Sequence, residues 1–343
     1  MFYRLLQYYI RIGLFFYFKK IRIYGLDKLP ENQPLMLLPN HQNALIDPLI
    51  IAAFAPVRPY FLTRADVFAN SFLIAFFKFL QMLPIYRMRD GRRSLSKNRA
   101  IFDQCGELLK RKEMIVVFPE ANHNLERRVR TLSKGFTRIL FHSLQRYPGL
   151  QPLLLPVGVN YRKAAGFPDS AAFYFGEPIA VTGLYDPEDS RSSSIKLTQS
   201  VEAQLRQLTT HIPEEYDYRA VEDYLESRNV DFLDPKRTNT LIAAANKSEA
   251  AQPRGALNWG VLIWDTIFML LNWPVILLWR ILVKPWVGEP EFYATHRFLL
   301  CLICYPLGYL IGVALLSGVL DALYIVLLTG GHALLNLLYV KFR

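Results

Sequence analysis

Apolar residues are concentrated at the two ends of the chain, whereas the middle alternates short apolar runs with longer helical patterns. Near the start, Arg4, Gln7 and Arg11 recur at spacings of three and four and therefore share one stripe of a helix. Aromatic side chains occupy most of its remaining surface, and two lysines close it. Residues 1–20 are predicted to form an amphipathic helix at a membrane interface, with docking onto the protein's own core as the alternative.

The middle of the chain, residues 21–230, has the pattern of an α/β domain. Apolar runs that end at Pro or Gly alternate there with helical stretches, as expected for buried strands. The four clearest runs cover residues 34–39, 114–119, 153–159 and 172–176. Because polar residues follow several of these runs, ligand-binding loops are expected at the carboxyl edge of the sheet.

The pattern changes again at residue 231, where Asn, Lys, Ser, Asp and Ala dominate. This composition predicts a polar, partly helical linker over residues 231–256. Beyond the linker, residues 257–343 contain three apolar segments, each close to the roughly 20 residues that span a bilayer. The segments are 257–283, 298–320 and 322–340. They predict a transmembrane region of two to three hydrophobic segments.

Polar residues complicate the first of these segments. Asp265 and Pro274 interrupt it, which fits a kinked span, a re-entrant hairpin or an interfacial platform. All five tryptophans of the chain lie on this segment or just after it, where they favour an interface. Asp321, between the other two segments, is expected in a turn. The number of spans therefore stays open.

The net charge of +11 indicates an anionic partner, and Lys and Arg clearly outnumber Asp and Glu between Arg87 and Arg138. Phospholipid headgroups, coenzyme A and acyl carrier protein all fit this charge. Nucleic acid is disfavoured, because that stretch contains no helix-turn-helix, zinc-finger or ribonucleoprotein motif. The 52% share of apolar residues exceeds that of an ordinary cytosolic domain and again indicates a membrane protein.

The three cysteines are too few for a useful disulfide framework, so the catalytic region is expected to be cytoplasmic. Cys301 and Cys304 form a C-x-x-C motif inside an apolar run, where thiols more often pack as small hydrophobic side chains than bind zinc. The chain has neither a convincing metal-ligand spacing nor a Gly-x-Ser-x-Gly or phosphate-loop motif. We predict no metal and no cofactor.

The segment 40–48, NHQNALIDP, holds the strongest candidates for catalysis. Pro48 suits the first position of a helix, which would place Asp47 at the N-cap, where backbone N–H groups keep a carboxylate ionised. His41 lies six positions earlier, so the two side chains meet only across a non-helical turn. A His–Asp pair there would act as a general base toward a hydroxyl group. The alternative is a plain N-cap and a loop histidine.

Four sequence blocks occur in order between about residue 24 and residue 179. They are NHQNALIDP at 40–48, LPIYR at 83–87, VFPEANH at 117–123 followed by LSKGF at 132–136, and LPVG at 155–158 followed by FGEPI at 175–179. Together they resemble the glycerolipid acyltransferase family, typified by bacterial 1-acyl-glycerol-3-phosphate acyltransferases. The resemblance implies an α/β fold with a mixed sheet flanked by helices, joined here to an N-terminal interfacial helix and C-terminal transmembrane helices.

Two features depart from the family pattern. Five residues separate His41 from Asp47, whereas the family generally has four, and the longer spacing resembles a subset of fungal-type glycerol-3-phosphate acyltransferases. Ala121 stands where the family usually has Gly, and an Asn-His pair follows it in place of the usual polar pair. The longer spacing leaves the acceptor open between lysophosphatidate and glycerol 3-phosphate.

The resemblance also implies roles for single residues. His41 would be the catalytic base, and Asp47 would stabilise its imidazolium. Arg87 would bind the acceptor's phosphate, since a planar guanidinium donates two charge-assisted hydrogen bonds where lysine acts as a point charge. The alternative for Arg87 is a solvated surface arginine.

Four further residues are implied to bind the acceptor. They are Phe118, Pro119, Glu120 and Lys134. Glu120 would organise Arg87 or bind glycerol hydroxyls, and its alternative is a structural ion pair. Three more arginines, at 127, 128 and 130, are candidates for phosphate or coenzyme contacts, unless they form a basic face toward anionic lipid. His123 is expected to be a loop histidine whose hydrogen bonds are satisfied.

These features predict an O-acyltransferase that moves a fatty acyl chain from acyl-CoA or acyl-ACP to a glycerol-phosphate acceptor in phospholipid synthesis, with lysophosphatidate as the first candidate. The alternatives are a glycerol-3-phosphate acyltransferase, a membrane thioesterase and a non-catalytic lipid-binding membrane protein. Membrane lipid, the thioester co-substrate and the acceptor are the expected partners. The protein is expected in a membrane, the bacterial inner membrane in particular, with its catalytic domain on the cytoplasmic face.

Overall fold

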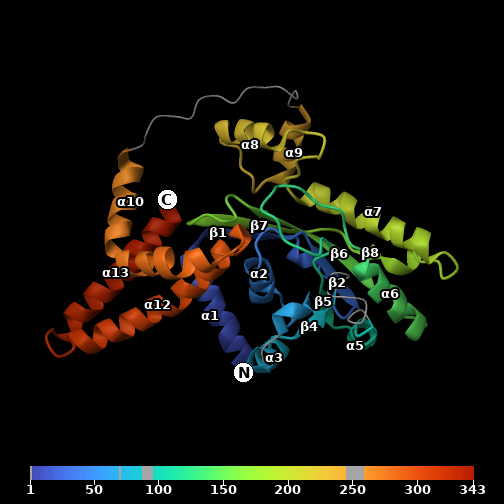
Figure 1. Cartoon of the computed structure of the whole chain (residues 1–343), viewed down its shortest axis with the longest axis horizontal. Coiled ribbons are helices and arrows are strands. Elements are labelled where there is room, and N and C mark those ends of the chain that lie inside the picture. Colours follow the sequence, from blue (N-terminus) through green and yellow to red (C-terminus); the bar gives the residue numbers. More distant parts are fainter. Residues whose placement is uncertain (1, 69–70, 87–95, 245–258) are drawn as a thin grey trace.

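A computed structural model describes residues 2–68, 71–86, 96–244 and 259–343. The described residues form an eight-stranded sheet in the order β1-β7-β6-β2-β5-β3-β4, with β8 also paired to β6 (Figure 1). The strands are β1 (Phe18–Tyr24), β2 (Leu35–Pro39), β3 (Tyr60–Arg64), β4 (Met82–Ile85), β5 (Met114–Val116), β6 (Leu153–Tyr161), β7 (Asp169–Phe175) and β8 (Ile179–Ala180). β6 runs antiparallel to β7 and β8, and the other pairs are parallel. The mixed α/β sheet is confirmed.

The central strands β2 and β5 are apolar at every position because both faces of the sheet are covered. Successive side chains of a strand point to opposite faces. In β2, Leu35 and Leu37 belong to one buried cluster, whereas Met36 belongs to a second cluster on the other face. This explains why the sequence shows continuous apolar runs here instead of alternation.

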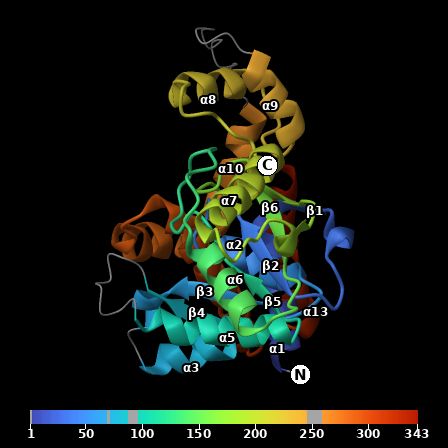
Figure 2. The same ribbon diagram turned by 90° about the vertical axis from the view of Figure 1, so that its right-hand side faces the viewer.

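Helices cover the two faces in separate groups (Figures 1 and 2). One cluster joins the sheet to α1 (Phe2–Tyr17), α2 (Ile46–Phe54) and α12 (Tyr293–Leu316). The opposite cluster joins it to α5 (Asn98–Lys110), α6 (Gly135–Arg146) and α7 (Ser190–Leu208). A further helix, α3 (Ser71–Phe79), precedes β4.

The N-terminal helix is one turn shorter than predicted. It ends at Tyr17, and Phe18 begins β1, which pairs with β7 at the sheet edge. Its polar stripe docks onto α2, where Gln7 Nε2 donates to the carbonyl of Ala52 at 2.9 Å and Arg11 donates to the next carbonyl. The opposite side of the helix exposes large apolar side chains. The membrane interface therefore stays a prediction for that side, while the other side docks on the core.

A small helical unit follows α7. It contains α8 (Tyr218–Ser227) and α9 (Pro235–Ala244), which share a separate buried cluster with Phe232 at its centre (Figure 2). The linker predicted over residues 231–256 therefore begins with a packed segment, because Phe232 and Leu233 are buried. Its remainder, from residue 245, lies outside the described residues.

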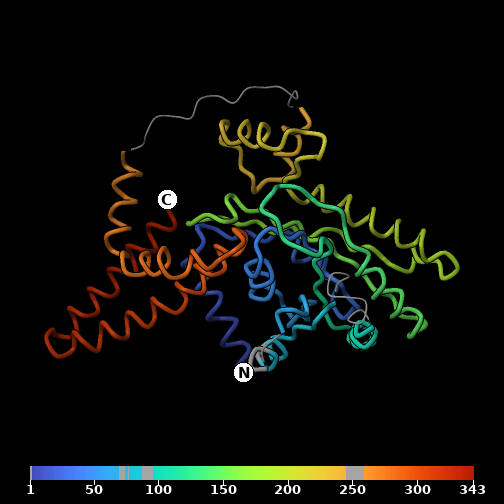
Figure 3. Tube along the Cα trace, viewed as in Figure 1, coloured from blue at the N-terminus to red at the C-terminus, as the bar shows by residue number. Residues whose placement is uncertain are grey.

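The C-terminal region consists of apolar helices that extend away from the sheet (Figure 3). Two helical segments, Pro290–Leu316 and Ala322–Phe342 (α13), are long and apolar enough to cross a membrane. A third candidate is broken: α10 (Trp259–Leu271) and the segment Trp273–Trp286, which begins with α11 (Trp273–Leu277), meet at 88°. Asp321 lies in the turn before α13, as predicted.

A glycine allows α1 to approach this region closely. A Cβ atom at Gly13 would lie 2.5 Å from a side-chain carbon of Leu302 on α12. Nearby, Tyr9 Oη donates to the carbonyl of Leu302 at 2.5 Å. Small residues permit such close helix packing in membrane proteins. The N-terminal helix α1 and the long apolar helix α12 therefore form one packed unit.

Candidate active site

The turn between β2 and α2 lies at the carboxyl edge of the parallel strands and is fastened to its surroundings. The Asn40 side chain accepts from the backbone N–H of Val159 at 2.6 Å and donates to the carbonyl of the same residue at 3.0 Å. Asn43 Nδ2 donates to the carbonyl of Ala164 at 2.6 Å. Both asparagines are buried, so β6 and the loop after it fix the turn.

This turn brings His41 and Asp47 together. His41 Nδ1 lies 2.8 Å from Asp47 Oδ2, which also accepts from the backbone N–H groups of Gln42 and Asn43, each at 2.9 Å. Because a carboxylate only accepts, Nδ1 is the protonated ring nitrogen and Nε2 carries the free electron pair. The arrangement has the geometry of a histidine base with its orienting carboxylate.

Tyr161 supplies the remaining hydrogen bond to this carboxylate. Its hydroxyl donates to Asp47 Oδ1 at 2.6 Å, and both residues are fully buried. Burial, reinforced by the negative charge of Asp47, raises the pKa of Tyr161 well above its usual value, so the phenol stays protonated and donates. The sequence does not single out Tyr161, although its place at the carboxyl end of an apolar strand is a usable signal.

The predicted N-cap role of Asp47 is wrong. The helix begins at Ile46, with Leu45 at the N-cap position, and the Asp47 N–H already donates to the carbonyl of Asn43 at 3.1 Å. The Asp47 carboxylate therefore bonds backward to the turn and not forward to its own helix. It still lies in the first helical turn, where the helix dipole favours an anion.

His41 is packed against two neighbouring rings. Phe118 stacks on it with ring centroids 4.0 Å apart, and His123 meets it edge-on at 5.5 Å. The His41 carbonyl accepts from the backbone N–H of Asn124 at 3.1 Å. These contacts hold the imidazole at the wall of a cavity of about 630 Å³.

The cavity has a cationic part and an apolar part. Its cationic lining comprises Arg64, Lys134 and Arg138. Lys134 is the residue before α6, so the first N–H groups of that helix also face the cavity and favour an anion there. Its apolar lining includes Phe61, Met82, Ile85, Phe102 and Ile139. A ligand that carries both a phosphate and an acyl chain matches this division.

The predicted phosphate ligand Arg87 lies outside the described residues. Tyr86, which precedes it in the sequence, lines the cavity. The Tyr86 backbone is fixed by Asn98, whose side chain accepts from its N–H at 3.0 Å and donates to its carbonyl at 2.8 Å. The carboxyl end of β4 therefore leads into the site.

Glu120 forms an ion pair. Its buried carboxylate pairs with Arg130 Nη2, and its other oxygen accepts from the Arg130 N–H at 3.3 Å. Burial raises the pKa of Glu120, and the Arg130 charge opposes that rise. Arg130 also reaches the His41 carbonyl at 3.5 Å. Glu120 therefore has the structural ion pair that was the alternative to acceptor binding. This ion pair lies next to the turn that holds His41.

The backbone after Glu120 is strained. Ala121 has φ +62°, a left-handed conformation that glycine adopts freely and that a Cβ atom disfavours. The family's usual Gly at this place is therefore explained by backbone geometry. Close by, Pro119 accepts from the Ser133 N–H at 2.7 Å, which closes the loop between them.

The family model described as Acyltransferase matches residues 20–160. The matched region begins in β1 and ends in β6, so it includes the turn that holds His41 and Asp47. No curated protein sequence matches the chain. Among solved structures, the 1-acyl-sn-glycerophosphate (LPA) acyltransferase PlsC from Thermotoga maritima is similar, with 17% identity and a TM-score of 0.38, over 54% of this chain and 72% of that chain.

Two arginines of the matched region do not have the free guanidinium that phosphate binding requires. Arg127 is buried, donates to the carbonyls of Tyr161 and Arg162 at 2.6 Å each, and stacks on Phe232. Arg128 donates to the carbonyls of Ile212 and Pro213. Both therefore join the matched region to the segment that leads into the α8–α9 unit, which corrects the expectation of phosphate or coenzyme contacts.

The C-terminal region closes one side of the acyltransferase cavity. Phe292, just before α12, lines it and meets the His123 ring edge-on at 4.9 Å. The Thr295 hydroxyl accepts from the Leu45 N–H at 3.2 Å, beside the catalytic turn. Sequence patterns did not indicate this contact, because Phe292 lies far along the chain and outside the four blocks.

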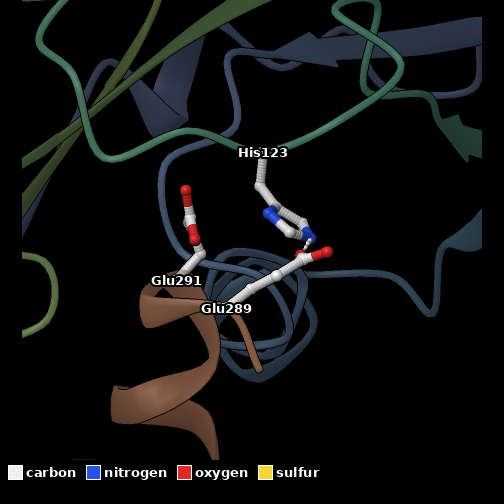
Figure 4. A group of neighbouring side chains, drawn as sticks. All are labelled: His123, Glu289 and Glu291. Carbon is white, nitrogen blue, oxygen red and sulfur yellow. Dashed lines mark ion pairs between the residues drawn. The ribbon is translucent and has the colours of Figure 1, made fainter. Parts of the chain in front are cut away.

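His123 lies between two carboxylates of the same C-terminal segment (Figure 4). Its Nε2 is 3.5 Å from Glu289 Oε2, and one ligand atom from each of His123, Glu289 and Glu291 falls within 4.8 Å of the others. Burial and the nearby His41 lower the pKa of His123, so it is neutral near pH 7. These donor atoms are of a kind that divalent cations accept, and the absence of a metal stays a prediction.

Proposed function

We propose that the protein transfers a fatty acyl chain from a thioester, acyl-CoA or acyl-ACP, to a hydroxyl group of lysophosphatidate, with glycerol 3-phosphate as the second candidate acceptor. The observation that supports this most directly is the 2.8 Å contact between His41 Nδ1 and Asp47 Oδ2 at the wall of a cationic and apolar cavity. The match of residues 20–160 to the Acyltransferase model supports the reaction class.

The chemistry follows from the free nitrogen of His41. Nε2 removes the proton of the acceptor hydroxyl while its oxygen attacks the thioester carbonyl carbon. The carbon–sulfur bond then breaks, the new ester is released, and the thiolate leaves and takes the proton from the imidazolium. Asp47 stabilises the imidazolium, and hydrogen bonds from Tyr161 and two backbone N–H groups hold the Asp47 carboxylate in place. This route needs neither an acyl-enzyme nor a metal.

The acceptor's phosphate would lie at the N-terminus of α6. Lys134 is exposed there, and Ser133 and Gly135 complete the lining. Helix N-termini and lysine both bind phosphate, so the site has two independent sources of positive potential. We assign Arg87 to the same phosphate. Phe118 keeps His41 in position by stacking on its ring. Pro119 and Glu120 hold the loop that borders the cavity.

Membrane attachment would bring the amphipathic substrates to this cavity. The exposed apolar side of α1 and the two long C-terminal helices are the surfaces for a bilayer. We place the catalytic domain on the cytoplasmic face, where acyl-CoA and acyl-ACP are available. In this division, residues 21–230 perform catalysis and residues 257–343 anchor the protein.

The experiment uses the full chain in a neutral detergent with radiolabelled acyl-CoA and, in a parallel set, radiolabelled acyl-ACP. Three reactions contain lysophosphatidate, glycerol 3-phosphate or no acceptor, and lipid products are separated from free fatty acid. We expect label in phosphatidate, or in lysophosphatidate if glycerol 3-phosphate is the acceptor. Release of label only as free fatty acid would identify a thioesterase, and no turnover with either thioester would leave only lipid binding.

A further inference from the structure

A second cavity lies among the C-terminal helices, separate from the catalytic one. Its volume is about 470 Å³, and the helices α10, α11 and α12 with the 278–286 segment form its walls. None of its lining residues lines the catalytic cavity. Three cations and six aromatic side chains line it together with aliphatic ones. They are Arg280, Lys284 and Arg297, with Phe167, Trp279, Tyr293 and Tyr305 among the aromatic residues.

The positive charge of this cavity is not neutralised within the described part of the chain. The ion pairs that involve carboxylates of the described C-terminal segments are Arg343 with Asp265 and His123 with Glu289. Asp265, the carboxylate in the lining, is thus already paired, with Arg343 Nε at 2.6 Å and the Tyr339 hydroxyl at 3.0 Å. A bound anion would therefore supply the negative charge that the three cations of the cavity do not receive from the protein.

Arg297 lines the cavity, and the surrounding structure holds its side chain in place. Its guanidinium stacks over Trp279 at 5.2 Å and over Phe167 at 5.8 Å. One terminal nitrogen donates to the carbonyl of Ala165 at 2.8 Å, while its Nε is buried and has no hydrogen-bond partner among the described residues. A buried donor without a partner is costly, and a phosphate oxygen satisfies it well.

The position of the cavity identifies the kind of anion. Its walls are the broken helix pair and a segment that is apolar enough to cross a membrane, and exposed tryptophans flank it at 273 and 286. Exposed tryptophans of this kind mark the headgroup level of a bilayer. A lipid phosphate can enter here with its acyl chains among apolar side chains. A diffuse basic surface would lack the aromatic walls and the buried donor.

We propose that this cavity binds one anionic phospholipid, with its phosphate between Arg280, Lys284 and Arg297. The site lies directly behind the catalytic turn, because adjacent residues of one loop receive bonds from both sides. Ala164 accepts from Asn43 of the turn, and Ala165 accepts from Arg297 of the cavity. The site is independent of the acyl transfer reaction, so lipid binding can be tested whether or not the enzyme is active.

The test measures lipid retention by the full chain in a neutral detergent, using native mass spectrometry. Dioleoyl phosphatidylglycerol is the probe, and dioleoyl phosphatidylcholine is the matched neutral-headgroup control. We expect one phosphatidylglycerol per chain, weaker retention of phosphatidylcholine, and about five-fold weaker binding for each of Arg280→Gln and Lys284→Gln. Both residues are exposed, so these variants are expected to fold. Arg297→Gln should also weaken binding.

Two controls make the outcome decisive. Lys196→Gln, on the distant helix α7, should leave phosphatidylglycerol binding unchanged, as should Lys134→Gln in the catalytic cavity. Equal retention of the two lipids, or full retention by the Arg280→Gln and Lys284→Gln double variant, would overturn the site. Loss of the lipid in Lys134→Gln alone would place it in the catalytic cavity instead. Displacement by millimolar inorganic phosphate would show that a free anion, not a lipid, is the ligand.

Discussion

The catalytic turn and the N-terminus of α6 border the same cavity but are built in opposite ways. In the turn, Asp47 is fully buried and receives hydrogen bonds from His41, Tyr161 and two backbone N–H groups. At α6, Lys134 is exposed. A proton transfer needs fixed geometry, whereas a lysine attracts a charged headgroup as a point charge and needs no fixed geometry. Substitutions in the two regions should therefore affect different kinetic constants.

The largest effect among the supporting residues is expected for Asp47→Asn. The amide cannot accept from all four donors and no longer stabilises the imidazolium, so kcat should fall by about 10³-fold. Asp169→Asn is the matched control, because Asp169 is also a buried carboxylate but lies outside the turn. Initial rates of the two purified variants check this. Equal losses of kcat in the two variants would mean that the rate depends on any nearby buried carboxylate and not specifically on the His41–Asp47 contact.

The Asp169→Asn variant also tests how the stability of the protein depends on pH. Burial raises the pKa of Asp169 from 3.8 to about 6, and its Oδ2 lacks a hydrogen-bond partner among the described residues. The folded state therefore binds the proton more tightly than the unfolded state, so its contribution to stability is full below pH 4 and falls as the pH rises to about 6. Asp169→Asn should flatten the dependence of Tm on pH in this window. An unchanged slope would contradict the assignment.

Tyr161→Phe tests the outer support of the turn. Removing the hydroxyl leaves Asp47 Oδ1 without a donor, so we expect about 2 kcal/mol lower stability and about ten-fold lower kcat. Tyr174→Phe is the matched control, since its hydroxyl donates to the carbonyl of Leu233 far from the turn. It should lower stability without lowering kcat. Denaturant unfolding and initial rates distinguish the two; an unaltered kcat in Tyr161→Phe would remove Tyr161 from the catalytic support.

Lys134→Gln tests the other region. It should raise the KM for the phosphate-bearing acceptor about five-fold and leave kcat nearly unchanged, because an exposed charge contributes little beyond attraction. The difference between wild type and variant should shrink as salt screens the charge. Lys196→Gln on α7 should change neither constant. A large fall in kcat for Lys134→Gln would show that this end of the cavity is as geometrically demanding as the turn.

The smallest effect is a gain in stability. Ala121→Gly relieves a left-handed alanine at φ +62° but increases the freedom of the unfolded chain, so the net gain should be about 0.5–1 kcal/mol. Ala203→Gly in the middle of α7 should instead lose about 1 kcal/mol. Thermal unfolding compares the two. A loss in both would mean that the surrounding loop, not glycine's freedom, sets the conformation at residue 121.

The sequence predicts those parts of the fold that repeat a simple pattern. Strands buried on both faces appear as apolar runs, so β2, β5, β6 and β7 were found, although β5 ends at Val116 and β7 begins at Asp169. The edge strand β1 was missed because its Lys and Arg residues resemble the end of a helix. The linker prediction failed at Phe232, whose burial depends on helices elsewhere in the chain.

In the candidate site, too, the sequence predicts what a local pattern contains and misses what depends on tertiary contacts. His41 and Asp47 are six residues apart, so a short motif contains both members of the pair. Tyr161 and Phe292 reach the site only through strand pairing and helix docking, which no local pattern encodes. The N-cap prediction for Asp47 failed for a related reason. Its carboxylate accepts hydrogen bonds from backbone N–H groups of the turn that precedes the helix. These hydrogen bonds depend on how the turn folds, which the sequence pattern does not reveal.

The central claim is that His41 is the base of an acyl transfer, and single-turnover acyl transfer tests it most directly. Labelled acyl-CoA and lysophosphatidate are mixed with excess wild-type enzyme or His41→Ala, and the ester product is measured over time. We predict that His41→Ala forms ester at least about 10³-fold more slowly while binding the acceptor with unchanged affinity. Ester formation at the wild-type rate by folded His41→Ala would contradict the account.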